Sequence, residues 1–431
     1  MTHKRDQQLG QQKPVVAPQP AQQHTAPPGI KQVDDIKIGG VSHPVVDGKV
    51  KLGGLEYSVV RGDHLGNVPG DVSGANVVLD SRCFSVAGAI KCAGNLLILS
   101  KKCSVRGAVE ADGDIVCHGR GLDAGGNIVS KNGSIKSRGV VFSTGGKVSA
   151  KGDLTSEEAF IRARGDVASM SGSVSAKLDV VSDEGGVTAK FNITSTEGKV
   201  SSALGIVASD GILKAKKDIT SSMSTILSKG DVASEEGSLK AKGDVNSKNG
   251  CVSARGDITS TNGIVRAQGS IESKEGGISA LYAVASAGSW IKARQDISSM
   301  GGVSAQGDIS SLEGGVSAAG KSISSAEGGV SAKKDIKTDA ASICAMGDIR
   351  SSGGQIDASK EITSKGGGIY ARGNIMSEMH KEVAAFGDIR SEQGYVEELT
   401  ASVKGTVSDA DEKGMKPRRR ITREELLAKQ P

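Results

Sequence analysis

The chain has 431 residues, of which 60 are glycine, five phenylalanine, four tyrosine and one tryptophan. Aromatic side chains normally fill much of a compact core, so their scarcity argues against ordinary globular domains and leaves Ile, Val, Leu and Ala to form the core. The net charge is +5, but 54 basic and 49 acidic residues are interspersed. Composition therefore favours neither the basic footprint nor the stacking platform of a nucleic-acid-binding protein.

Residues 1–34 are rich in Gln and Pro and contain few apolar side chains, so we expect them to be disordered. They contain no apolar stretch typical of a secretory signal peptide. No segment of the chain approaches the roughly 18 apolar residues of a transmembrane helix. We therefore expect a cytoplasmic protein, with a virion or cell-surface protein exported without such a signal as the alternative.

Residues 35–112 are β-like but irregular. The stretch GKVKLGGLEYSVV (48–60) alternates between apolar and polar residues, and NLLILSKKCSV (95–105) contains an apolar run. The terminal units of a repeat stack are usually atypical, because they cover its open edge. We expect this region to be an N-terminal cap or a small β domain.

Residues 113–396 repeat a thirteen-residue pattern. Counting from Ile115, with a few one-residue insertions and deletions, all 22 positions are Ile, Val or Leu. A second aliphatic column follows seven residues later. Ser comes two residues after the first aliphatic residue, and Ala two residues after the second. Because a spacing of two is the period of a strand, each repeat predicts two short strands separated by turns whose glycines tolerate positive φ.

Strands this short find backbone partners by stacking on copies of themselves. The sequence therefore predicts an all-β, parallel β-solenoid (β-helix). We favour a coil of thirteen residues, because it stacks each Ser and Ala column on itself and sets large side chains against small ones across a thin core. The alternative is a triangular coil of about 19–20 residues, in which the two kinds of strand stack on each other in alternation.

Residues 397–431 are charged, and we expect a flexible tail. Thr422 and Glu425 form a capping box, which predicts a short helix over 423–429. The basic segment KPRRR (416–420) is of the kind that contacts anionic partners or serves as a nuclear address. Five residues in a solvated tail do not establish either role.

Two motifs are explained by the repeat itself. The triplet RGD occurs at 61–63, 164–166 and 255–257; the last two copies are the repeat's Gly-Asp turn, so turn chemistry is favoured over adhesion. The turn aspartates could form a carboxylate ladder for Ca²⁺, but the nine-residue period of calcium-binding β-rolls is not seen. These aspartates are Asp114, Asp153, Asp166, Asp231, Asp244, Asp257, Asp308, Asp348 and Asp388.

Other reactive residues form no recognisable constellation. The six cysteines are irregularly spaced, so we expect no disulfide framework. Cys83, Cys92, Cys103 and the pair Cys117-His118 lack the close Cys pairs of a zinc site. The serine column is attributed to hydrogen bonds with the strand ladder and the turn backbone. We predict no catalytic residues, no cofactor-binding residues and no metal ligands.

The GDI-x-S-x-x-G-x-V-x-A lines resemble the haemagglutinin-type repeats of large secreted bacterial adhesins. The layout, a β-helical core between polar tails, also resembles bactofilins, which are bacterial cytoskeletal proteins that polymerise end to end without nucleotide. The similarity covers roughly residues 113–396. The adhesins' secretion region is absent, and bactofilins are usually shorter and lack the thirteen-residue period. The resemblance implies a β-helical fold and a structural role, and no family site is carried over.

We expect a non-enzymatic structural rod or scaffold that self-associates into filaments or larger assemblies, with a further protein partner through its tails. The alternative is a surface adhesin or fibre, with the solenoid as stalk and residues 35–112 as binding head. A β-helix polysaccharide-degrading enzyme is less favoured, because such enzymes use aromatics for sugar stacking and the chain has only Trp290. We expect no small-molecule substrate and no specific nucleic acid.

Overall fold

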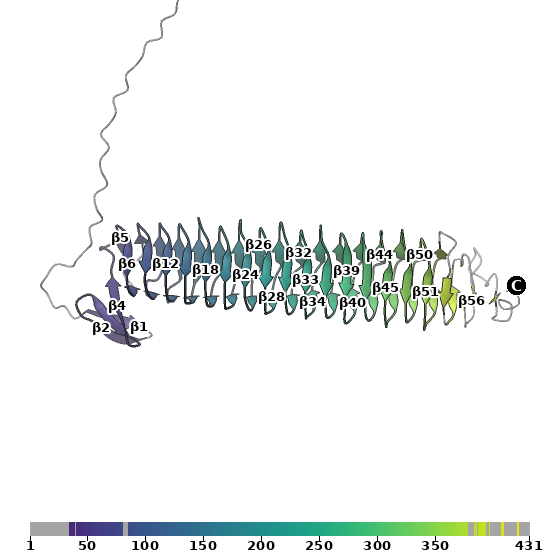
Figure 1. Cartoon of the computed structure of the whole chain (residues 1–431), viewed down its shortest axis with the longest axis horizontal. Helices are drawn as coiled ribbons and strands as arrows, with labels where there is room; N and C mark the ends of the chain where they lie inside the picture. The colour runs from purple at the N-terminus through teal and green to yellow at the C-terminus, as the bar shows by residue number, and fades with distance from the viewer. Residues whose placement is uncertain are drawn as a thin grey trace, which may run out of the picture.

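The computed structural model describes residues 34–38, 40–80, 85–377, 383–385, 387–393, 396, 407–408 and 420–421. These residues form β-strands without any helix, and they build an elongated rod (Figure 1). The predicted parallel β-solenoid is confirmed, because the strands stack into three parallel sheets along the rod. The disorder predicted before residue 34 and the helix predicted over 423–429 lie outside the described residues.

Successive strands of the coil fall in turn on three sheets, called sheets 1, 2 and 3 here. Sheet 1 comprises β7(Val77–Leu79), β10(Leu96–Ile98), β13(Ile115–Cys117), β16(Ile135–Ser137), β19(Leu154–Ser156), β22(Val174–Ala176), β25(Ile193–Ser195), β28(Leu213–Ala215), β31(Val232–Ser234), β34(Val252–Ala254), β37(Ile271–Ser273), β40(Ile291–Ala293), β43(Ile309–Ser311), β46(Val330–Ala332), β49(Ile349–Ser351), β52(Ile369–Ala371) and β55(Ile389–Ser391). Sheet 2 comprises β5(Asn67–Val68), β8(Ser85–Val86), β11(Cys103–Val105), β14(Gly121–Ala124), β17(Val140–Ser143), β20(Ile161–Ala163), β23(Val180–Ser182), β26(Val200–Ser202), β29(Ile219–Ser221), β32(Leu239–Ala241), β35(Ile258–Ser260), β38(Ile278–Ala280), β41(Ile297–Ser299), β44(Val316–Ala318), β47(Ile336–Thr338), β50(Ile356–Ala358) and β53(Ile375–Ser377). Sheet 3 comprises β6(Val72–Gly74), β9(Ile90–Cys92), β12(Val109–Ala111), β15(Ile128–Ser130), β18(Val148–Ala150), β21(Val167–Ser169), β24(Val187–Ala189), β27(Ile206–Ala208), β30(Ile226–Ser228), β33(Val245–Ser247), β36(Val265–Ala267), β39(Ala283–Ser286), β42(Gly302–Ala305), β45(Ile323–Ser325), β48(Ile343–Ala345), β51(Ile362–Ser364) and β54(Val383–Ala385).

One turn of the coil takes three strands, and corner residues that bond to each other from turn to turn are 19 or 20 residues apart. On sheet 1, Ile115 pairs with Ile135, and Ile135 pairs with Leu154. The favoured thirteen-residue coil is therefore wrong and the triangular alternative is correct. Each thirteen-residue repeat does contain two short strands, so a turn uses one and a half repeats. The turns stack to a rod about 80 Å long at the usual strand spacing.

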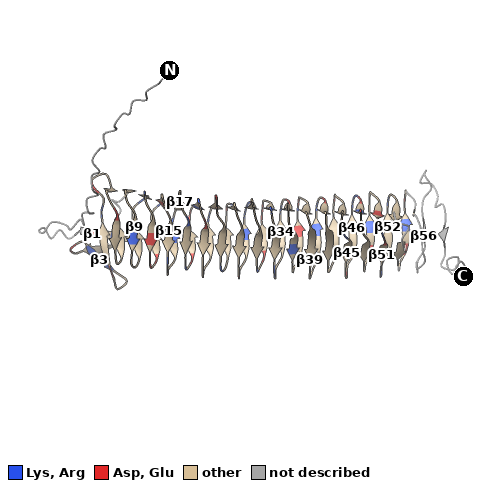
Figure 2. Ribbon diagram, turned by 45° about the horizontal axis from the view of Figure 1, so that its top comes forward, with Lys and Arg blue, Asp and Glu red and all other residues tan. Residues whose placement is uncertain are grey.

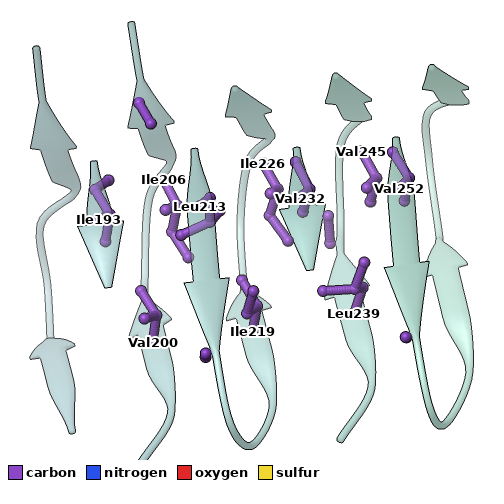
Figure 3. Close-up of a cluster of buried hydrophobic side chains, with 14 of the residues drawn as sticks. Ile193, Val200, Ile206, Leu213, Ile219, Ile226, Val232, Leu239, Val245 and Val252 are labelled. Atoms are coloured by element: carbon purple, nitrogen blue, oxygen red, sulfur yellow. The ribbon is translucent and has the colours of Figure 1, made fainter. Parts of the chain in front are cut away.

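The inward side chains of the three sheets meet in one core along the rod axis. The first residue of nearly every strand is a fully buried aliphatic, and the third is a buried Ser or Ala. Figure 3 shows Ile193 and Leu213 from sheet 1, Val200 from sheet 2 and Ile206 from sheet 3 pointing into the same interior. One large and one small side chain from each strand fill this narrow triangle, which accounts for the scarcity of aromatics.

Corners of two lengths alternate along each edge of the rod. A four-residue corner follows an Ile-x-Ser strand, as at 131–134, and a three-residue corner follows a Val-x-Ala strand, as at 151–153. The Ser130 hydroxyl donates to the carbonyl oxygen of Gly113, in the three-residue corner of the preceding turn (2.7 Å). It also accepts a hydrogen bond from the Gly133 N–H (3.1 Å). The predicted bonding of the serines to turn backbone is confirmed, and at Ser130 it holds a long corner on a short one.

Glycine is required in the long corners by close approach of the backbone. A Cβ placed on Gly276 would lie 2.3 Å from Oδ1 of Asp257 and 2.7 Å from its backbone nitrogen. In the described part of the chain, positive φ occurs only at Asp47 and at glycines up to Gly66, and again at Gly121. The expectation that the repeat glycines supply positive φ is therefore wrong.

A small antiparallel unit precedes the solenoid. Strands β1(Asp34–Ile38) and β2(Val41–Val45) pair with each other, as do β3(Lys49–Leu52) and β4(Leu55–Val60). The end of β4 then pairs in parallel with β7 and so enters sheet 1. Ile36, Val45 and Val50 pack on Val78, which faces outward from sheet 1. This unit lies beside the N-terminal end of the rod (Figure 1).

The regular stack extends beyond the predicted limits of the repeat. Strands β5 to β12 already occupy the three sheets, although their residues belong to the region predicted as an irregular cap. At the other end, Val396 bridges to Ile375. Two short strands, β56(Val407–Ser408) and β57(Arg420–Ile421), follow β55 within the predicted tail.

The serine bonds make a first prediction. Ser260 is buried, donates to Gly243 O (2.7 Å) and accepts from Gly263 N (3.1 Å). Replacing it in Ser260→Ala removes both bonds and should lower the free energy of unfolding by about 1–2 kcal/mol in urea denaturation. The matched control is Ser279→Ala on the outward side of β38, which should change stability by less than about 0.5 kcal/mol. Equal losses of stability in the two variants would contradict a stabilising role for the two Ser260 hydrogen bonds.

The corner geometry makes a second prediction. Gly276→Ala should destabilise the fold by at least about 2 kcal/mol, because the new methyl group would meet the backbone and carboxylate of Asp257. Gly205→Ala is the control, since its Cβ would lie 3.5 Å from the nearest atom, the Thr225 carbonyl oxygen. That control should unfold at the wild-type urea midpoint or slightly above it. A harmless Gly276→Ala would show that close approach does not select glycine here.

Candidate functional site

Side chains of the RGD triplets form ion pairs and hydrogen bonds with other residues of the chain. Arg164 Nε lies 2.9 Å from Glu184 Oε1 in the next turn, and Asp166 Oδ1 accepts the Gly186 N–H at 2.8 Å. The triplet at 255–257 makes the same two contacts. In the first triplet, Arg61 pairs with Asp80 at 2.8 Å. The interpretation of these residues as turn chemistry agrees with this geometry.

The turn aspartates act as hydrogen-bond acceptors for the backbone of the next turn. Asp114 Oδ1 accepts the Ser134 N–H at 2.8 Å, and Asp153 Oδ1 accepts that of Ser173 at 2.7 Å. Short corners recur at one edge every second turn, so neighbouring aspartates of one edge are about 10 Å apart. Each carboxylate joins its own turn to the next one through its hydrogen bond with the backbone N–H. Several basic residues beside corner aspartates pair with a Glu one turn later, as Arg294 beside Asp296 pairs with Glu313 (3.0 Å), and this hydrogen bond raises the pKa of Arg294.

The cysteines of the candidate zinc set lie on different strands of the solenoid. Cys92, Cys103 and Cys117 are buried inward residues of β9, β11 and β13, one on each sheet. Burial raises the pKa of the Cys92 thiol to about 12 and also raises that of Cys117. Among the described residues, no three His, Cys, Asp or Glu side chains gather as metal ligands would. Cys83 lies outside the described residues.

The surface of the rod has several hollows, and two of them adjoin sheet 1 and sheet 3. One, of about 330 Å³, separates the antiparallel unit from sheet 1 and is lined by His43, Leu52, Tyr57 and Leu97, among others. There the Asn95 amide donates to the Tyr57 hydroxyl (3.3 Å). The other, of about 500 Å³, runs over sheet 3 and is lined mainly by Ser and Ala. Both are open to solvent.

The strongest candidate is an exposed apolar surface at the middle of the rod, called the mid-rod patch here. Met170, Phe191 and Ile212 lie in three successive turns on the edge between sheets 3 and 1, with exposed fractions of 69%, 45% and 37%. Leu204 and Met223 lie on the edge between sheets 2 and 3, 46% and 66% exposed. Between these edges are the outward residues of four consecutive strands of sheet 3, Ala168, Thr188, Val207 and Leu227.

The sheet that carries the patch has few charged residues on its outward side, and the six outward residues that follow Arg266, on β39 to β54, are uncharged as well. Seven successive outward residues of sheet 3 are uncharged, between Glu110 on β12 and Arg266 on β36. They are Val129, Ser149, Ala168, Thr188, Val207, Leu227 and Asn246. Over the same turns the other two sheets carry Lys136, Lys214, Arg162 and Lys240. Figure 2 shows the strands of sheet 3 between β15 and β39 mostly in tan.

The patch breaks the repeat in ways the sequence displays. Phe191 takes the place that glycine has in the Lys-Gly-Asp corners, such as 151–153. Met170 takes the place that Lys131 has in the corner at 131–134. The sequence alone does not bring these departures together, because assigning them to one edge requires the length of the coil.

No family model, curated protein or solved structure matches this chain. The resemblance to adhesin repeats and to bactofilins therefore rests on repeat style alone, and what is established is the β-solenoid fold. No helix that could cross a membrane is present in the described part of the chain.

The burial of the thiols makes a third prediction. At pH 8 a maleimide should modify Cys251 and Cys344, which are partly exposed, much faster than Cys92, Cys103 and Cys117. The raised pKa of about 12 at Cys92 means that its reactive thiolate is scarce below that pH. Mass spectrometry of labelled peptides, native against urea-unfolded, provides the comparison. Rapid native labelling of Cys92 would contradict a closed core at the N-terminal turns.

Proposed function

We propose that this protein is a non-enzymatic structural rod that self-associates through its sides. The observation that carries the proposal is the mid-rod patch. Soluble monomers rarely expose a large contiguous apolar surface, and where they do, it often marks an interaction site. The patch combines five large exposed apolar side chains with an uncharged sheet face, while neighbouring faces carry charge.

The internal use of polar groups supports a structural role. Serine hydroxyls, turn aspartates and many corner cations are directed at the next or the preceding turn. Such contacts repeat from one end of the stack to the other and stiffen it. A rod whose polar side chains mainly bond neighbouring turns to each other is suited to a role as a spacer or scaffold.

The proposal is tested by removing the apolar side chains of the patch. A Met170→Ser/Phe191→Gly variant uses residue types that other corners of this chain contain at those places. It should raise the dissociation constant for self-association by at least about tenfold, measured by sedimentation velocity over a concentration series. Negative-stain microscopy of the wild type should show rods paired or bundled side by side.

Leu312→Thr is the matched control, because Leu312 is 55% exposed on a different edge, between sheets 1 and 2. It removes comparable apolar surface away from the patch and should leave association unchanged. Wild-type rods that remain dispersed monomers at the highest soluble concentration would refute self-association. An equal loss in the control would refute the assignment to the patch.

A further inference from the structure

We infer that two copies of this chain pair face to face through sheet 3 with their rods antiparallel, centred on β24. This inference rests on the proposed function and specifies its partner and register. The occupant of the mid-rod patch is a second copy, aligned so that Glu110 of each copy meets Arg266 of the other. The arrangement follows from the spacing of charges and apolar side chains along the sheet.

The charge spacing selects the antiparallel direction. Glu110 lies on β12 and Arg266 on β36, and β24 is four strands from each of them along sheet 3. A two-fold axis across the rod at β24 therefore sets opposite charges together at both ends of the uncharged stretch. Parallel pairing in register would instead set Glu110 against Glu110 and Arg266 against Arg266, which is unfavourable.

The apolar edge has the same centre. Met170, Phe191 and Ile212 follow β21, β24 and β27 respectively, so Phe191 lies in the middle layer. In the antiparallel arrangement the edge between sheets 3 and 1 meets its own counterpart. Phe191 of one copy then faces Phe191 of the other, and Met170 faces Ile212. The charge spacing and the apolar edge between sheets 3 and 1 thus share one centre and point to a symmetric, self-complementary interface. Leu204 and Met223, on the other edge, lie one and two layers to one side of that centre.

The size of the face is sufficient for a specific contact. Eight strand steps from β12 to β36 span about 38 Å, and a strand with its flanking corner residues is about 16 Å wide. The face is therefore roughly 600 Å² on each copy, or roughly 1,200 Å² in total, which lies at the lower end of stable interfaces. An apolar centre with charges at its ends has the usual anatomy of such a contact.

Charge reversal tests the register. Glu110→Arg and Arg266→Glu should each raise the dissociation constant by about tenfold, because each substitution places like charges together at both ends. The variant that carries both reversals should recover the wild-type constant. This recovery is decisive, because Glu110 also has Lys91 beside it on its own ladder, and an intramolecular effect would not be repaired by Arg266→Glu.

Cross-linking tests the direction independently. Glu110→Cys and Arg266→Cys chains are mixed and treated with a bismaleimide of about 10 Å reach, the usual distance between packed sheets. Antiparallel pairing predicts more cross-linked dimer in the mixture than in either chain treated alone. The single-chain reactions also measure the background of cross-links through native cysteines. Dimers formed equally in each separate pool would overturn the antiparallel direction.

The outcomes separate this inference from the proposed function. Association that persists but is insensitive to all three charge variants would overturn the register and leave self-association standing. Absence of association in the wild-type chain would remove both. Urea midpoints of the variants should match the wild type, because both residues face outward from the core.

Discussion

The structure depends on pairing the backbone of each turn with the turns above and below it. Strands of three residues provide too few hydrogen bonds to hold their own register, so the corners must supply the rest. Ser130 and Asp114 illustrate how this is done. The hydroxyl reaches down to a glycine carbonyl, and the carboxylate accepts an N–H from the turn above. In both of these contacts a four-residue corner lies on a three-residue corner, whereas Ser202 and Ser228 make the serine contact from three-residue corners that lie on four-residue ones.

The solenoid could be predicted from sequence because its core needs aliphatic residues at fixed intervals, and Ile115 and its successors show that interval directly. The coil length does not follow from the repeat alone, because columns of unlike residues stack on each other in this fold. Ser130 in fact stacks between Ala111 and Ala150, and its hydroxyl bonds explain why. The early turns were missed for a related reason. Their third positions hold Cys92, Ile98 and Val105 in place of Ser or Ala, so the strands persist while the repeat pattern does not.

The mid-rod patch was beyond sequence reasoning for a geometric reason. Phe191 and Ile212 lie in different repeats, and although Phe191 visibly replaces a corner glycine, only the length of the coil shows that a full turn brings the two corners to one edge. The uncharged face depends on the same information, because Thr188 and Val207 become ladder neighbours only in the triangular coil. The motifs that sequence did reveal, the RGD triplets and the aspartates, proved to be parts of the scaffold.

Because the repeat and the turn differ in length, a change in the number of repeats affects the core of this rod and its surface differently. One repeat advances the chain by two strands, or two thirds of a turn. Loss or gain of a single repeat would therefore keep the alternation of large and small side chains in the core while rotating all later residues onto a different face. Only a change of three repeats, which equals two full turns, keeps the later outward residues on the same face as before. Evolution can thus vary the length of such a rod freely, but it can conserve a surface pattern only by adding or removing repeats in threes.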